Sequence, residues 1–431
     1  MSNNRTLRVG MLGCGVVGSN VARLLREDSG DFAARSGATL TLAKVAVKNA
    51  STKRENVDQS IITTDPHSIV NDPSIDIVIE VMGGIEPARE LILTAIKNGK
   101  SIITANKALL ALHGAELFEA ADKNGVDLYY EAAVGGAIPI LRPMRESIVG
   151  DHVHRVMGIV NGTTNYILTK MDEEGSAFAD VLKEAQALGF AEADPTADIE
   201  GHDAAAKAAI LAGLAFHSRV TSKDVYCEGI SKISARDVAV ARDMDHVIKL
   251  LAIAELTSDN HVSVRVHPTL ISRQHPLASV RNAFNAVFVE AESAGELMFY
   301  GRGAGGAPTA SAVLGDLIAI ARNKTRGGEG HGESDYAELS IASIDKVKSR
   351  YLIRLDVADK PGVLATVAQL FATSNVSIET VRQSGRGDSA ELIVATHAAP
   401  ESSLQKTVDA LAKSDVVKSV ESVLRIESSA K

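Results

Sequence analysis

Apolar segments with strand character alternate with helical segments along the first third of the chain. Three strongly apolar runs predict buried strands: TLRVGML at 6–12, TLTLAKVAV at 39–47 and IDIVIEVM at 75–82. A helix is expected at 87–98, followed by strand KSIIT, a helix to about residue 123 and strand VDLYYEAAV. Such alternation is typical of a parallel, doubly wound sheet. We therefore predict a Rossmann-type α/β domain over residues 1–134.

The pattern changes from about residue 135. Residues 153–160 and 261–270 predict longer, half-buried strands in a mixed or antiparallel sheet. The helices expected around them cover 178–188, 203–217 and 245–256. These elements indicate a second, α+β domain over residues 135–302. The segment 303–321 is Gly-rich and then helical, and we expect it to return to the first domain.

The last part of the chain has the pattern of a separate small domain. Residues 322–335 are polar and Gly-rich, which is typical of a flexible linker, and we place the linker at 322–350. Residues 351–428 then give the order βαββαβ, a ferredoxin-like fold. The chain as a whole is predicted to be an α/β protein with three such parts.

Composition narrows the class of protein. The chain has 431 residues and a net charge of −9, with no strongly basic block, which argues against a nucleic-acid partner. Its two cysteines, Cys14 and Cys227, give neither a disulfide framework nor metal-ligand spacing. No signal peptide precedes the first strand, and no apolar stretch reaches the roughly 18–20 residues of a membrane span. We expect a cytoplasmic protein without a membrane partner.

A glycine pattern follows the first predicted strand and opens a helix. Gly13, Gly15 and Gly18 form GxGxxG, with Val16 and Val17 between the last two. The first glycine permits a tight turn, the second allows a pyrophosphate to approach the backbone, and the third allows close helix–strand packing. The helix N-terminus then favours the anionic pyrophosphate. We predict a dinucleotide cofactor; the alternative is a Gly-rich turn with a structural role only.

The end of the second strand bears on the choice of cofactor. An Asp or Glu there would bind the ribose 2′-hydroxyl of NAD. This strand instead ends in Val47-Lys48-Asn49, with Lys53 and Arg54 close behind. Cations at this place suit the 2′-phosphate of NADP. The alternative is that they are ordinary surface cations and that both NAD and NADP are accepted.

Two lysines are candidates for catalysis. Lys107 follows strand KSIIT, which places it at the carboxyl edge of the sheet, where α/β enzymes build their sites. Asp203 and Lys207 are four residues apart and share one face of a helix that is otherwise nearly all apolar. A buried lysine beside a carboxylate is suited to proton exchange. The alternatives are a surface lysine at a helix start and a weak surface salt bridge.

The loop before this helix is unusually acidic. The run GFAEADPTADIEGHD contains Glu192 and Asp198, which could bind an ammonium group and orient a lysine or a water. The alternative for Asp194 and Glu200 is that they cap a helix or are solvated loop residues, without a role in binding. The loop predicts a pocket for a small cationic or amphoteric substrate.

At this point the chain resembles homoserine dehydrogenase, over residues 7–321. The motifs are GMLGCGVVG, VMGG, TANKALLA, EAAVGGAIPI, NGTTNYIL, GFAEADPTADIEGHDAAAKAAIL and GRGAGGAPTASAVLGD. The resemblance implies the NAD(P)-dependent interconversion of L-homoserine and L-aspartate 4-semialdehyde, a step in threonine, methionine and isoleucine biosynthesis. It also implies a homodimer or homotetramer, with the second domain supplying the interface.

The resemblance assigns roles by position. Lys207 is expected to exchange the proton at the substrate oxygen, Asp203 to orient it, and Lys107 to contact nicotinamide and substrate. The remaining positions are Glu192, Asp198 and Thr163 for the substrate, and Thr104 and Gly305, with the fingerprint and Lys48, for the cofactor. Many relatives have arginine where this chain has Lys48, and lysine lacks the bidentate fork for phosphate, so discrimination for NADP is expected to be weaker.

The family also implies a monovalent cation, usually sodium, bound mainly by backbone carbonyls. The matching positions are Glu131, Val134, Gly136 and Ile138. The sequence by itself does not suggest a metal, because Gly135-Gly136 reads equally well as a bend between two domains.

The C-terminal unit resembles an ACT domain, on the motif Asp359-Lys360-Pro361-Gly362 after its first strand. ACT domains bind amino acids and regulate the enzyme that carries them, which makes threonine the expected effector. An oligomerisation module without a ligand is the alternative. Two other functions stay open for the whole chain: a catalytically silent amino-acid and nicotinamide sensor, and a dehydrogenase for another amino-acid substrate.

Overall fold

The computed structural model describes residues 5–427, except 55, 331, 333–336, 338 and 387–388. The chain divides into two compact units. Unit 1 comprises residues 1–156, 206–223 and 285–338, and unit 2 comprises 157–205, 224–284 and 339–431. Over the described residues, no helix combines the length and hydrophobicity needed to cross a lipid bilayer.

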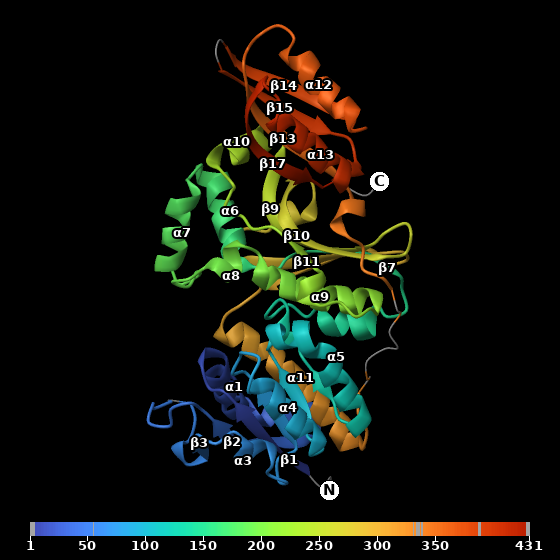
Figure 1. Cartoon of the computed structure of the whole chain (residues 1–431). Coiled ribbons are helices and arrows are strands. Elements are labelled where there is room, and N and C mark those ends of the chain that lie inside the picture. The colour runs from blue at the N-terminus through green and yellow to red at the C-terminus, as the bar shows by residue number, and fades with distance from the viewer. Residues whose placement is uncertain are drawn as a thin grey trace. The chain divides into compact units, whose positions relative to one another are not determined.

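Unit 1 is built on a six-stranded sheet of order β3-β2-β1-β4-β5-β6 in which every pairing is parallel (Figure 1). This is the strand order of a dinucleotide-binding Rossmann sheet, so the prediction of fold class is confirmed. The strands are β1 (Arg5–Leu12), β2 (Ala38–Ala46), β3 (Ile62–Thr63), β4 (Ile77–Glu80), β5 (Ser101–Thr104) and β6 (Leu128–Tyr129). The predicted strand VDLYYEAAV is shorter than expected, because a 3₁₀ turn, Glu131–Ala133, follows β6.

Helices cover this sheet and complete its core. They are α1 (Val16–Glu27), α2 (Ser29–Ser36), α3 (His67–Val70), α4 (Ala88–Lys97), α5 (Lys107–Asn124) and α11 (Gly306–Arg326). Helix α11 is remote in sequence, yet its buried face, including Val313, Leu317 and Ile320, joins the core formed by β1 and α1. It extends to Arg326, five residues beyond the predicted end. Strands β11 (Phe284–Ala291) and β12 (Gly295–Arg302) precede it and are neighbours in a second sheet.

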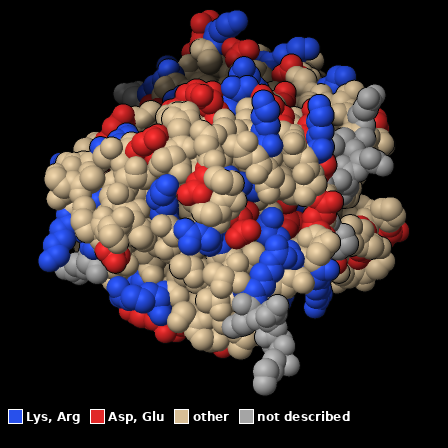
Figure 2. Space-filling model, turned by 90° about the horizontal axis from the view of Figure 1, so that it is seen from below, with Lys and Arg blue, Asp and Glu red and all other residues tan. Residues whose placement is uncertain are grey.

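On the face that Figure 2 shows, Lys and Arg side chains are interspersed with Asp and Glu over a largely uncharged surface. No continuous field of positive charge appears on that face, as the composition of the chain led us to expect.

Unit 2 contains a mixed sheet with the run β9-β10-β17-β13-β15-β14. Its elements outside the C-terminal domain are α6 (Gly162–Glu174), α7 (Phe178–Ala187), α8 (Thr196–Ile199), β8 (Tyr226–Cys227), α10 (Ala235–Asp243), β9 (His246–Leu256) and β10 (Val262–Ser272). Strand β7 (Val153–Ile159) and helix α9 (His202–Phe216) belong partly to each unit. Strands β7 and β10 and helices α7 and α9 agree with the elements predicted at 153–160, 261–270, 178–188 and 203–217, whereas α6, α8, β8 and α10 were not predicted.

The helix predicted at 245–256 is wrong, because these residues form strand β9. The segment is mostly apolar and rich in Leu and Ala, interrupted by Lys249, and periodicity does not distinguish a buried helix from a buried strand in such a run. Strand β9 pairs antiparallel with β10 over its full length, from Leu256 opposite Val262 to His246 opposite Ser272. Eight of its eleven residues are buried, so pairing and burial on both faces override helix propensity.

The C-terminal domain has the predicted order βαββαβ. Its elements are β13 (Lys348–Val357), α12 (Val363–Thr373), β14 (Ile378–Arg386), β15 (Ser389–Thr396), α13 (Glu401–Ala412) and β17 (Val417–Ile426), with a short β16 (Ala399–Pro400) beside β13. An apolar core that includes Ile353, Phe371 and Leu404 lies between the sheet and the two helices. The last predicted residue of this domain, 428, lies outside the described residues.

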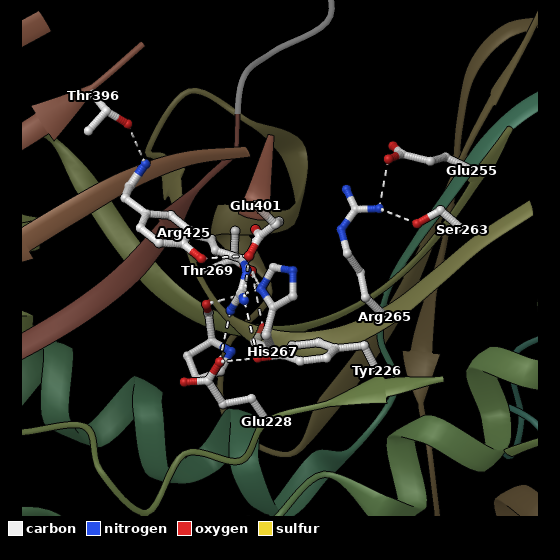
Figure 3. Close-up of polar contacts among 12 residues, drawn as sticks. Tyr226, Glu228, Glu255, Ser263, Arg265, His267, Thr269, Thr396, Glu401 and Arg425 are labelled. Atoms are coloured by element: carbon white, nitrogen blue, oxygen red, sulfur yellow. Dashed lines mark hydrogen bonds and ion pairs between the residues drawn. The ribbon is translucent and has the colours of Figure 1, made fainter. Parts of the chain in front are cut away.

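Strand β17 joins this domain to the rest of unit 2. It pairs in parallel with β10 at Thr269 and Leu270, and the backbone N–H of Glu427 donates to the carbonyl of Leu270 (2.8 Å). Arg425, on β17, is buried beside this junction (Figure 3). Its guanidinium donates to Glu401 of the same domain (Nε–Oε1 2.8 Å) and to Glu228 after β8 (Nη1–Oε2 2.8 Å). The two parts of unit 2 therefore share one sheet and one buried ion-pair network.

A second ion-pair network links the C-terminal domain to α10. Arg354, on β13, donates to Asp237 of α10 (Nε–Oδ1 2.8 Å) and to Glu391 of β15 (Nη1–Oε1 2.7 Å). Glu391 also pairs with Arg236 of α10. The hydrogen bond from Arg236, assisted by Arg354, lowers the pKa of Glu391 from 4.5 to about 2. Glu391 therefore stays ionised in the folded protein well below the pH at which a free glutamate is protonated.

Replacement Glu391→Gln should reduce acid-dependent stability. Because the pKa of Glu391 is lower in the folded chain than in the unfolded chain, its stabilisation is complete above pH 4.5 and is lost as the pH falls towards 2. After allowance for solvent screening we expect a loss of about 2 kcal/mol at pH 6 that shrinks as the pH is lowered. Urea unfolding of both proteins between pH 3 and 6 measures this, and a difference independent of pH would contradict it.

Candidate active site

A cavity of about 510 Å³ lies at the carboxyl edge of the parallel sheet in unit 1. The residues around it come from the carboxyl ends of β1, β2, β3 and β4 and the segments that follow them, as expected of a dinucleotide site in this fold. They are Gly13, Cys14, Gly15, Ala46, Val47, Lys48, Arg54, Thr64, Pro66, Val81, Met82 and Pro87. The cavity brings together the glycine fingerprint and the cations after the second strand.

The fingerprint glycines have the separate roles that the motif predicts. Gly13 has φ +98°, and a Cβ atom there would lie 2.8 Å from the backbone of Val81 and Met82. A Cβ on Gly18 would lie 2.7 Å from the carbonyl oxygen of Gly13, so helix α1 packs closely on the turn. A Cβ on Gly15 would meet nothing within 4 Å. Gly15 therefore faces open space at the helix N-terminus, where a pyrophosphate would approach. Val16 and Val17 follow it as the first residues of α1.

The two cations at the cavity differ in how they are held. Lys48 is exposed. Arg54 is half-buried, and its guanidinium donates to the carbonyls of Cys14 (3.3 Å) and Thr52 (2.7 Å). Lys53, the third cation of the prediction, is exposed and is not among the residues that surround the cavity. Arg54 thus ties the loop after the second strand to the fingerprint turn, and Lys48 presents an exposed cation.

Glu80 is a residue that the sequence reasoning missed. It ends β4, is fully buried, and its carboxylate accepts from the backbone N–H groups of Met82 (2.9 Å) and Gly83 (3.0 Å). Thr104 Oγ1 donates to the same carboxylate (2.6 Å). The side chain of Thr104 therefore supports the VMGG turn through Glu80. The signal was present in the sequence as a single carboxylate at the end of an apolar strand.

Lys107 is the first residue of α5 and is half-buried. Asn106 caps this helix, since its side chain accepts from the backbone N–H of Leu109 (3.2 Å) and donates to the carbonyl of Gly84 (2.6 Å). The cap fixes the turn from which Lys107 projects, at the carboxyl edge of the sheet. Gly305, with φ +115°, is the N-cap of α11 and also belongs to unit 1.

In unit 2, one amide holds two of the predicted carboxylates. Asn161, the N-cap of α6, donates from Nδ2 to Asp198 Oδ1 (2.7 Å) and to Asp203 Oδ2 (3.0 Å). Asn161 is only 5% exposed. Its two hydrogen bonds bring together acids from α8 and α9. The sequence analysis identified the motif NGTTN but assigned only its Thr163 to the substrate. The role of Asn161 depends on partners 37 and 42 residues away.

The other two residues assigned to the substrate lie in or near the same loop. The hydroxyl of Thr163 donates to the carbonyl of Phe190 (2.7 Å), which ties α6 to the start of the acidic loop. Glu192 is exposed, and its backbone carbonyl accepts from Gln186 (3.1 Å). The described hydrogen bonds therefore group Asp198 and Asp203 on Asn161, with Glu192 on the exposed part of the loop.

Helix α9 carries Asp203 and Lys207 four residues apart. Lys207 is 9% exposed, and the alanines around it are buried, Ala204 and Ala208 among them. Asp203 is half-buried. A lysine so buried is not a solvated surface group, so the interpretation of this pair as a weak surface salt bridge does not hold.

The segment assigned to a cation follows β6. The carboxylate of Glu131 accepts from the backbone N–H groups of Ile140 (2.7 Å), Leu141 (2.9 Å) and Arg142 (2.8 Å), which folds 131–142 into a closed loop. Gly135 and Gly136 have φ +74° and +56°. Over the described residues no group of three His, Cys, Asp or Glu side chains could hold a metal. A site here would rely on backbone carbonyls, the hard oxygen ligands that suit sodium.

Three family descriptions match the chain. Residues 13–131 match the NAD-binding domain of homoserine dehydrogenase, residues 139–318 match homoserine dehydrogenase, and residues 351–415 match the ACT domain. The chain belongs to the homoserine dehydrogenase family. It is accordingly an NAD(P)-dependent oxidoreductase with a C-terminal ACT domain, as its motifs indicated.

Named homoserine dehydrogenases match over almost their whole length. The protein from Corynebacterium glutamicum is 55% identical over 423 residues, covering 97% of this chain and 95% of the relative. That from Mycobacterium tuberculosis strain H37Rv is 52% identical over 435 residues, covering 99% and 98%. The crystal structure of a homoserine dehydrogenase from Thiobacillus denitrificans is 40% identical, with a TM-score of 0.94 and 99% coverage of both chains. A hyperthermophilic archaeal homoserine dehydrogenase solved with NADPH is 28% identical, with a TM-score of 0.62 and coverage of 73% and 97%.

Replacement of Gly13 and of Gly15 by alanine should distinguish an effect on folding from an effect on cofactor binding alone. Gly13→Ala places a methyl group against the backbone of Val81 at a positive φ, so we expect unfolding at a temperature lower by several degrees and loss of NAD(P)H binding. Gly15→Ala should melt close to the wild type but bind NAD(P)H at least tenfold more weakly, because its methyl group faces the open space. Thermal melting and NADPH fluorescence titration test this. Tight binding by Gly15→Ala would exclude a pyrophosphate at this turn.

Proposed function

We propose that Lys207 exchanges the proton at the substrate hydroxyl as L-homoserine and L-aspartate 4-semialdehyde are interconverted, and that Asp203 orients it. The observation that carries this proposal is the placement of Lys207 in a buried, alanine-rich helix one turn after a carboxylate that Asn161 holds. An amine can serve as a general acid–base group, and a carboxylate one helical turn away lies on the same helix face and can orient it.

The remaining chemistry divides between the cofactor and this chain. The nicotinamide dinucleotide, when bound, supplies the hydride acceptor. Lys107, at the edge of the sheet, is proposed to contact both nicotinamide and substrate, and Thr104 and Gly305 to line the cofactor. Glu192 is proposed to bind the substrate ammonium, with Asp198 and Thr163 completing the substrate site. An exposed carboxylate in an otherwise organised loop is suited to capture an ammonium group.

Replacement Lys207→Ala should abolish most turnover and leave cofactor binding intact. Removal of a general acid–base group typically lowers the rate by about 10²–10⁴-fold. Formation of NADPH from L-homoserine, followed at 340 nm, gives kcat, and fluorescence titration gives the Kd for NADPH. Lys183→Ala, at an exposed lysine of α7, is the matched control and should retain full activity. Near-normal kcat in Lys207→Ala would remove Lys207 from the mechanism.

NADP is the proposed preferred cofactor. Lys48 and Arg54 both lie at the cavity beside the end of β2, where the ribose 2′-phosphate would be placed, and none of the described residues that surround the cavity carries a carboxylate. The archaeal relative solved with NADPH agrees with this choice. Because Lys48 is a single flexible ammonium, we expect a preference and not an exclusion of NAD.

Replacement Lys48→Ala should raise the KM for NADP about five- to tenfold and change the KM for NAD by less than twofold. The reason is that an exposed ion pair with a phosphate contributes about 1 kcal/mol. Lys53→Ala, at an exposed lysine away from the cavity, is the control. Equal effects on both cofactors would show that Lys48 does not recognise the 2′-phosphate.

A sodium ion is proposed at the backbone carbonyls of Glu131, Val134, Gly136 and Ile138. Among the described residues, no backbone hydrogen bond ends on the carbonyl of Val134, Gly136 or Ile138, so these oxygens fit the requirement of a hard cation. A bound ion would fix the conformation of this loop. The backbone N–H groups of Ile140 and Arg142 donate to the Glu131 carboxylate and close the same loop, which supports the proposed site.

The ACT domain is proposed to bind an amino-acid effector, with L-threonine, a downstream product, as the expected inhibitor. The proposed setting is the biosynthesis of threonine, methionine and isoleucine in the cytoplasm, by a homodimer or homotetramer. The contacts of the ACT domain support regulation, because Arg354 links it to α10, Arg425 links it to Glu228 after β8, and strand β17 pairs with β10.

A further inference from the structure

Strand β9 carries a buried lysine that the proposed chemistry does not use. Lys249 is 1% exposed, and its Nζ donates to Asn165 Oδ1 (2.9 Å) and to the carbonyl of Val280 (2.6 Å). Desolvation lowers its pKa to about 8. The charged groups that face it are Asp172 and Glu173 on α6, with Arg273 and Arg281 after β10. A buried ammonium is costly compared with an apolar side chain, so its position calls for an explanation.

Asn165, the partner of Lys249, fastens α6 to the segment that precedes β11. Its Nδ2 donates to the carbonyls of Val280 (3.3 Å), Asn282 (2.9 Å) and Phe284 (3.0 Å). An ammonium can only donate, so Lys249 determines that the amide oxygen faces β9 and that the amide nitrogen faces these carbonyls. Lys249 and Asn165 together close the space between β9, α6 and residues 280–284.

The same face of α6 leads to the substrate carboxylates. Asn161 and Asn165 are four residues apart, and both are buried. Asn161 holds Asp198 and Asp203, as described above. Between them, Gly162 lies so close to segment 280–284 that a Cβ would be 2.9 Å from the carbonyl of Ala283. A small rotation or shift of α6 would therefore move the amide that carries both acids.

We propose that Lys249 is a positioning residue: through Asn165 it sets the placement of α6, and thereby the hold of Asn161 on Asp198 and Asp203. The inference rests on the proposed role of these acids in the substrate site. It assigns a function to the second asparagine of NGTTN and to a lysine remote from it in sequence.

The test compares two buried lysines. Lys249→Met keeps the volume and removes the ammonium. Lys100→Met is the matched control, since Lys100 is 2% exposed and its Nζ donates to the carbonyls of Asp72 (2.5 Å) and Ile75 (2.9 Å) in unit 1. Steady-state rates with L-homoserine and with NADP, and the Kd for NADPH, are measured for both proteins and the wild type.

We expect Lys249→Met to raise the KM for L-homoserine at least tenfold, with the Kd for NADPH and the KM for NADP within twofold of the wild type. Lys100→Met should change all of these by less than twofold, whatever its melting temperature. Lys249→Gln restores an amide donor to Asn165 and should recover most of the loss. Should Lys249→Met fail to fold, Asn165→Ala takes its place, and the same rise in KM is expected.

An unchanged KM for L-homoserine in Lys249→Met, or an equal rise in Lys100→Met, would overturn the inference, because the effect would then be absent or due to stability alone. Failure of the proposed function gives a different result. In that case Lys207→Ala retains turnover, or the wild type shows none with L-homoserine.

Discussion

One amide organises the acidic side of the site. Two carboxylates close together repel each other, and each loses hydration when it is buried. The Nδ2 group of Asn161 offsets this by donating to Asp198 and Asp203 at once, while its Oδ1 caps helix α6. The proposed substrate-binding and proton-transfer groups therefore depend on the placement of a single helix terminus. Acids held in fixed positions need no reorganisation when a substrate binds, which is an advantage for binding and catalysis.

Buried charge recurs wherever unit 2 must fix one element against another. Arg425 and Arg354 connect the ACT domain to β8 and α10, and Lys249 connects β9 to α6. Such contacts are weak evidence for stability, because desolvation offsets much of the ionic attraction. Their contribution is to geometry, because an ammonium or guanidinium group only donates hydrogen bonds and therefore requires acceptor atoms at suitable positions.

The sequence anticipated the two groups of candidate residues to different degrees. The glycine turn, Lys48 and Arg54 surround one cavity, as their positions in the sequence suggested, because GxGxxG and the cations after β2 are near neighbours of the elements that position them. Glu80, which supports the VMGG turn, was missed, since a single acid at the end of an apolar strand is visible in the sequence but its hydrogen-bond partners are not. Among the residues proposed for the substrate, the sequence singled out Asp198 and Asp203, which the structure brings together on one amide. Asn161 was not singled out, because a residue that binds partners 37 and 42 positions away leaves no local signal.

The sequence by itself determined the Rossmann domain, its glycine turn and the βαββαβ order of the ACT domain. These follow from local causes: hydrophobic period, backbone freedom at glycine and turn chemistry. The tertiary structure decided that His246–Leu256 is a strand, because pairing with β10 outweighs the helix propensity of an apolar Leu- and Ala-rich run. It alone decided which buried polar groups meet, such as Lys249 with Asn165, 84 residues apart. The physical reason is that a hydrogen bond is specified by position in space, whereas the sequence records only the residue types available to form it.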